Sequence, residues 1–96
     1  MNIEKTKWAK NFKEQCSYQY AEAIKIATDP TLRVAIFLST ELEEPVWAVS
    51  AMRGDMVTDF WLDAFPTLEL AKKLCKAMKW GHVEYGKDIS QHYEWD

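Results

Sequence analysis

The fold is decided by residues 46–65, which read VWAVSAMRGDMVTDFWLDAF. Two runs rich in valine, tryptophan, phenylalanine and methionine flank Gly54-Asp55, and a two-residue Gly-Asp loop is suited to a tight β-hairpin. The stretch therefore predicts two antiparallel strands, residues 46–52 and 56–65.

The hairpin loop also predicts which side chains share a face of the sheet. It pairs Arg53 with Met56, and strand alternation then sorts the remaining side chains. One face is expected to form the core and carries Trp47, Val49, Ala51, Thr58, Phe60 and Leu62. The opposite face carries Val46, Ala48, Ser50, Met52, Val57, Asp59, Trp61 and Asp63. Because burying a carboxylate is costly, Asp59 and Asp63 predict that this second face is solvated.

Helices and further strands are predicted on both sides of the hairpin. Apolar residues recur with a helical period over residues 3–27, and residues 32–39 alternate as a strand. Thr67 is a suitable N-cap for a second helix, which Gly81 would end. Residues 82–85 can add a short edge strand.

These elements predict an α+β fold in the order α-β-β-β-α. The expected architecture is a small antiparallel sheet of three or four strands covered by two helices. A length of 96 residues suits a single domain over residues 1–96. Residues 86–96 are expected to form an ordered or partner-binding C-terminal tail.

Charge and composition narrow the classes of partner and the cellular location. Twelve lysine and arginine residues stand against fifteen aspartate and glutamate residues, for a net charge of −3, which argues against nucleic acid as the main partner. The N-terminal residues lack the apolar core of a signal peptide, and no apolar run is long enough to span a membrane. Cys16 and Cys75 are isolated cysteines, typical of free thiols in a reducing cytoplasm.

Catalytic chemistry finds little support in the sequence. Cys75 and His82 are close enough along the chain to suggest a thiol and its base, but Cys75 belongs to the apolar stripe of the second helix. The histidines and carboxylates near the C-terminus match no zinc spacing, and the three glycines are isolated. The sequence therefore predicts a protein that is not an enzyme and holds no metal or cofactor.

An aromatic side chain rimmed by charge on the solvated sheet face suggests a protein-binding patch. The C-terminal tail, residues 86–96, also combines aromatic and acidic side chains. The predicted partner contacts are Met52, Val57, Asp59, Trp61, Asp63, Tyr93 and Trp95. A second copy of the chain, giving a homodimer, or the chain's own tail could cover the same face.

The second helix offers a different surface, which carries Lys72, Lys73, Lys76 and Lys79. The α-β-β-β-α order resembles that of double-stranded-RNA-binding domains, and this resemblance implies a nucleic-acid-associated regulator as the alternative function. That family docks RNA with a lysine-rich start to its second helix, whereas residues 67–70 of this chain contain no lysine.

The leading hypothesis is a non-catalytic protein-binding module that blocks or modulates a larger protein partner. A compact, acidic, aromatic-rich chain is similar in style to small phage- or plasmid-encoded inhibitors, such as inhibitors of CRISPR nucleases, and to regulatory adaptors. The nucleic-acid-associated regulator comes second and a small enzyme comes third.

Overall fold

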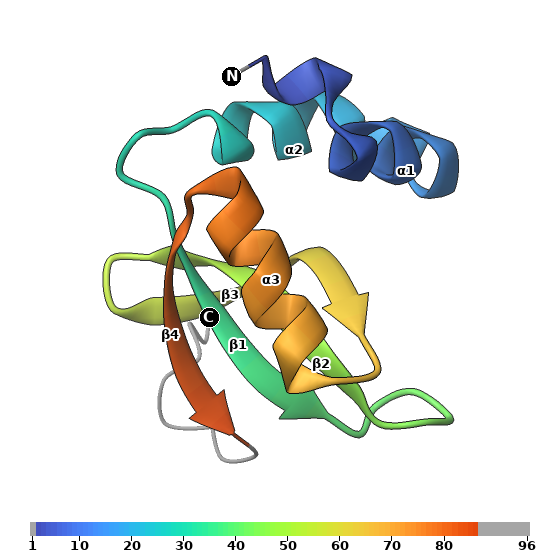
Figure 1. Ribbon diagram of the computed structural model, residues 1–96, viewed down its shortest axis with the longest axis vertical. Helices are drawn as coiled ribbons and strands as arrows, with labels where there is room; N and C mark the ends of the chain where they lie inside the picture. Colours follow the sequence, from blue (N-terminus) through green and yellow to red (C-terminus); the bar gives the residue numbers. More distant parts are fainter. Residues whose placement is uncertain (1, 87–96) are drawn as a thin grey trace. The chain divides into compact units, whose positions relative to one another are not determined.

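Four strands form one mixed sheet in the computed structural model, which describes residues 2–86 (Figure 1). The chain separates into two compact units, Met1–Leu32 and Arg33–Asp96, and the sheet belongs to the second unit. The single domain expected over residues 1–96 stays a prediction.

The sheet has the strand order β3-β2-β1-β4 and is covered on one face by a helix of the same unit. Its elements are β1 (Arg33–Ser39), β2 (Val46–Arg53), β3 (Met56–Phe65), α3 (Leu68–Met78) and β4 (Gly81–Gly86). β1 pairs with β2 and β2 with β3 in antiparallel fashion, as predicted, but β4 runs parallel to β1. A helix long enough to cross the sheet returns the chain to the end where β3 began, so the next strand runs in the direction of β3 and β1. The expectation of a purely antiparallel sheet is therefore wrong.

The ends of α3 are set by two local features. The Thr67 hydroxyl accepts a hydrogen bond from the Leu70 backbone N–H at 3.3 Å, which confirms the predicted cap. At the other end Lys79, rather than Gly81, adopts the left-handed conformation, with φ of 60°. The Trp80 N–H then donates to the Cys75 carbonyl at 2.9 Å, which closes the helix and directs the chain into β4.

One face of the sheet packs under α3. Glu84 of β4 pairs in register with Ile36, and the Lys72 ammonium of α3 lies 3.9 Å from the Glu84 carboxylate, so α3 is on the Ile36 side. Val34 and Ile36 are fully buried there, together with Val49, Ala71 and Cys75. This face is the main core of the unit.

The opposite face is apolar as well, which contradicts the predicted solvated face. Its buried cluster comprises Ala35, Phe37, Ala48 and Val57, against which Met52, Trp61 and Tyr85 pack as partly buried side chains. The Trp61 ring meets Phe37 edge-on, with the ring centroids 6.0 Å apart. Ser50, also assigned to the solvated face, is fully buried.

An irregular β2–β3 pairing explains this error. Met52 pairs with Val57 as the loop predicts, but Trp47 pairs with Phe65 instead of Leu62, so β3 contains three extra residues. A β-bulge places residues of one strand without direct partners in the other and breaks the simple alternation of faces.

Side-chain hydrogen bonds hold the irregular region in place. The buried Ser50 hydroxyl donates to the Thr58 carbonyl at 2.5 Å, and the Thr58 hydroxyl donates to the Ala51 carbonyl at 2.7 Å. These bonds satisfy carbonyls at the point where the regular ladder is interrupted. Asp59 is exposed in this irregular region, so the bulge allows β3 to carry a solvated carboxylate although one face of the strand is buried.

The first unit contains two short helices where the sequence predicts one helix over residues 3–27. Its elements are η1 (Ile3–Lys5), α1 (Lys7–Gln15), η2 (Ser17–Gln19) and α2 (Tyr20–Ala27). The break is at Cys16, with φ of −148° and ψ of 58°. A continuous helix could not pack on itself, whereas the break lets α1 contact α2, with Ala9 and Ala23 fully buried. The α-β-β-β-α order is thus incomplete, since a further helix and a parallel strand are present.

Candidate binding site on α3 and β4

A row of lysines forms the exposed side of α3. Lys72 and Lys76 lie one turn apart on one flank of α3, Lys73 lies beside them, and Lys79 is the left-handed residue directly after the helix. All four side chains are exposed. We call these four residues the basic face of α3.

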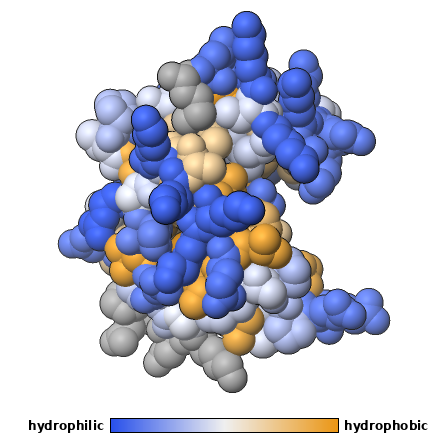
Figure 2. Space-filling model, in the orientation of Figure 1, coloured by the Kyte–Doolittle hydropathy of each residue, from blue (hydrophilic) through white to orange (hydrophobic). Residues whose placement is uncertain are grey.

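The basic face surrounds an open hollow of about 620 Å³ at the end of α3 and the start of β4. The hollow is lined by Lys72, Lys73, Cys75, Lys76, Lys79, Trp80, Gly81 and His82. Cys75 and Trp80 are buried, whereas the lysines are exposed, so an apolar floor lies within a charged rim. Figure 2 shows hydrophilic side chains across the surface over α3, with hydrophobic surface between them.

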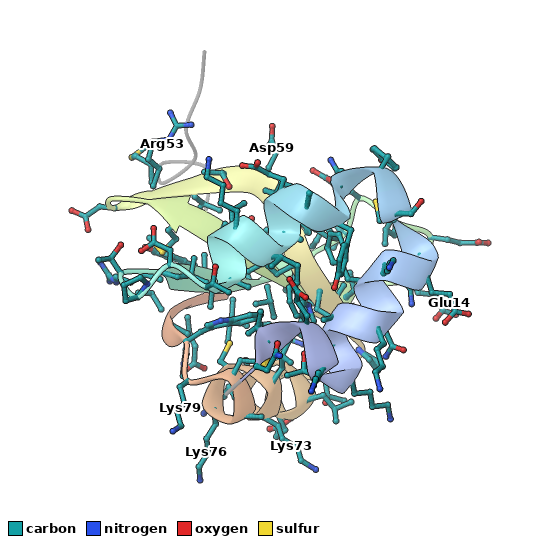
Figure 3. All side chains as sticks on the ribbon, turned by 90° about the horizontal axis from the view of Figure 1, so that it is seen from above. Glu14, Arg53, Asp59, Lys73, Lys76 and Lys79 are labelled. Carbon is teal, nitrogen blue, oxygen red and sulfur yellow. The ribbon has the colours of Figure 1, made fainter. Side chains whose placement is uncertain are left out.

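Positive charge exceeds negative charge around this hollow. Lys72 pairs with Glu84 at 3.9 Å, but both side chains are close to half exposed, and such pairs contribute little stability. Within residues 2–86, Lys73, Lys76 and Lys79 form no ion pair. Figure 3 shows these three side chains extending away from α3 toward the same side. Lys73, Lys76 and Lys79 can therefore meet carboxylates or phosphates without first breaking an ion pair within the described residues, and only Lys72 would exchange its weak pair with Glu84.

The suspected thiol chemistry is not favoured by this arrangement. Cys75 and His82 both line the hollow, but Cys75 is fully buried and burial raises the pKa of its thiol to about 11. A nucleophilic cysteine needs the opposite shift, because the thiolate is the reactive form. Cys75 therefore suits the hollow as part of its apolar floor.

The two thiols should differ in their reactivity toward a thiol reagent at pH 8. Cys16 is partly exposed and should react in the folded protein, whereas Cys75 should react only after denaturation, because about one thiol in a thousand is ionised at a pKa near 11. Mass spectrometry after timed labelling, with a Cys16→Ser variant as the control, gives each rate separately. Rapid labelling of native Cys75 would contradict this and restore the catalytic hypothesis.

The residues predicted to contact a partner from the sheet are mainly packed against the sheet itself. Val57 is fully buried, while Met52 and Trp61 lie against the cluster around Phe37 as partly buried side chains. They do not form the flat exposed patch that strand alternation predicted. Contact of Met52 and Trp61 with a partner remains a prediction.

The acidic and C-terminal members of that set are in different environments. Asp59 is exposed (Figure 3), whereas Asp63 is half-buried and desolvation raises the pKa of its carboxyl group. The Asp63 carboxylate also accepts a hydrogen bond from the Ala64 backbone N–H at 2.8 Å, which lowers the pKa in part. Tyr93 and Trp95 lie outside the described residues.

Among residues 2–86, no three histidine, cysteine, aspartate or glutamate side chains are grouped closely enough to hold a metal ion. None of the helices described here has the length and apolar composition required to cross a membrane.

The sequence indicated the lysines and suggested Cys75 with His82, but it did not reveal the hollow that these residues line or the buried Trp80 in its floor. No local pattern in the sequence marks the hollow, because it forms only where the end of α3 meets the start of β4. Comparisons of the chain with protein-family models, curated proteins and solved structures found no match.

Proposed function

We propose that the chain is a non-catalytic binding module that occupies an acidic surface on a larger protein through the basic face of α3. By covering that surface it blocks or modulates the partner. The observation that carries the proposal is the hollow of about 620 Å³, which has four exposed lysines around buried Cys75 and Trp80.

The combination of charge and apolar floor supports a protein partner. Lysine ammonium groups steer acidic surfaces into contact, while the aliphatic stems of the same side chains extend the apolar surface of the hollow. An apolar side chain of the partner can enter the hollow while neighbouring carboxylates meet the lysines. Such an anchored centre with a charged rim is typical of protein interfaces.

Nucleic acid is the second candidate, because the same four lysines could contact phosphates. Two features disfavour it: the chain has fifteen acidic against twelve basic residues, and the start of α3 carries Glu69 rather than lysine. Binding to duplex RNA or DNA at physiological salt should therefore be no tighter than about 10 µM, the range of non-specific binding.

A pull-down with three forms of the protein tests the proposal in an extract of the cells that produce it. The baits are the unchanged protein, Lys73→Glu/Lys76→Glu, and Lys10→Glu/Lys25→Glu. The last variant is the matched control, because it makes the same change in net charge at exposed lysines of α1 and α2. Each pull-down is repeated after nuclease treatment, and bound proteins are identified by mass spectrometry.

The proposal predicts a protein that the unchanged bait and the control retain, that Lys73→Glu/Lys76→Glu loses, and that nuclease does not release. Release by nuclease would favour the nucleic-acid alternative. Retention by all three baits would show that the partner binds elsewhere. Light scattering of the purified baits identifies self-association, the outcome in which the bound protein is a second copy of the chain.

A further inference from the structure

The two edges of the sheet differ in their capacity to accept another strand. β3 forms one edge, and its three extra residues and two aspartates disturb regular pairing there. β4 forms the other edge, and it pairs with β1 without a bulge from Gly81 to Glu84. Bulges and charges are the usual protection of an edge strand, so β3 is protected and this part of β4 is regular. In the described part of the chain no strand pairs with the outer side of β4.

The regular part of β4 lies beside the basic face of α3. His82 and Glu84 pair with Val34 and Ile36, so their side chains are on the face of the sheet that α3 covers. His82 lines the hollow, and Glu84 contacts Lys72. A strand added to β4 would lie about 4.8 Å further out, and every second side chain would point to the α3 side of the sheet.

We propose that the outer edge of β4 binds an extended, acidic segment of a partner protein as an added strand. Backbone hydrogen bonds to residues 81–84 hold the segment. Carboxylates at alternate positions meet the lysines of α3, while the side chains between them point to the other face of the sheet. Strand addition combines affinity from the backbone with specificity from alternate side chains in this way. The inference rests on the proposed function, because it specifies the form of the acidic surface that the basic face binds.

Two fluorescent octapeptides of identical composition test the inference by anisotropy with the full chain. One alternates glutamate and threonine, and the other has four glutamates followed by four threonines. The alternating peptide should bind about tenfold more tightly, because only its strand places all four carboxylates on one side. Lys73→Glu/Lys76→Glu should weaken its binding by about tenfold or more, whereas the control Lys10→Glu/Lys25→Glu should have little effect.

Methylation of the backbone nitrogens of the peptide tests for strand pairing, because binding that depends on charge alone would not respond to it. In a strand, the N–H groups of the glutamates point to one edge and those of the threonines to the other. Methylating one set should abolish binding, and methylating the other should leave it intact. The amide hydrogens of residues 81–84 should also exchange more slowly when the alternating peptide is bound.

The outcomes separate this inference from the proposed function. If both peptides bind equally and both depend on Lys73 and Lys76, strand addition is wrong but the acidic docking surface stands. If neither peptide binds, strand addition is again wrong, and the pull-down decides the docking surface independently. Displacement of the alternating peptide by duplex RNA at physiological salt, at concentrations below about 10 µM, would favour nucleic acid as the occupant. Slow amide exchange at residues 81–84 without peptide, unchanged when peptide is added, would show that the edge is already covered.

Discussion

Phe37→Ala should lower the free energy of unfolding by about 3–5 kcal/mol, the range for removing a fully buried aromatic side chain. Phe37 is 3% exposed and is the largest residue of the buried cluster on the face opposite α3. The substitution removes the ring that Trp61 meets edge-on, so the cost combines lost burial with lost aromatic contact. Denaturation in urea, followed by circular dichroism, measures the change directly.

Phe60→Ala is the matched control, because it is the same chemical change in the same unit. Strand alternation from the hairpin loop would place Phe60 in the core, whereas the irregular β3 leaves it partly exposed. Its substitution should therefore cost about 1–2 kcal/mol, clearly less than that of Phe37. Asp59→Ala, at an exposed position, should cost less than about 1 kcal/mol. A larger cost for Phe60 than for Phe37 would mean that the simple hairpin register is correct.

The contrast between these positions shows which part of the sheet could be predicted from the sequence. Gly54-Asp55 identified the turn, and the pairing of Arg53 with Met56 next to it is confirmed. Beyond the turn, Ser50 and Thr58 donate hydrogen bonds to strand carbonyls where the register of the β2–β3 pair shifts. The alternation of side chains in the sequence gives no sign of this shift in register. Asp59 and Asp63 predict a solvated face, but the bulge removes both from the simple alternation: Asp59 is exposed, and Asp63 pairs with Val49 on the face that α3 covers.

The helices and the last strand show a similar limit. The Thr67 cap and the lysine flank follow from local chemistry, and both were predicted. The break at Cys16 was not, because the apolar period continues through it and the reason for the break is the packing of α1 on α2. The direction of β4 was also missed, since a run of six residues contains no information on its neighbour. The hollow depends on both α3 and β4, so no local pattern could have revealed it.

Trp61→Ala decides whether the second face of the sheet belongs to the core or to an interface. An exposed anchor would lose association and leave folding nearly intact, at a cost below about 1.5 kcal/mol. The observed packing predicts the opposite result, in which folding stability falls and binding is retained. Because Trp61 is partly buried against Phe37 and the cluster around it, the substitution should cost about 2–4 kcal/mol in free energy of unfolding.

A double-mutant cycle between Trp61→Ala and Phe37→Leu isolates the contact from the burial of each side chain. The edge-on arrangement, with centroids 6.0 Å apart, should give a coupling of about 0.5–1.5 kcal/mol. Thermal melting and light scattering on the Trp61→Ala variant complete the test. A stable variant that no longer associates would identify Trp61 as the interface anchor and require the cluster around Phe37 to be open to a partner. A destabilised variant that still binds the alternating glutamate–threonine peptide would assign Trp61 to the core and place binding at the basic face of α3. The loss of stability and the binding would then arise from opposite faces of the same sheet.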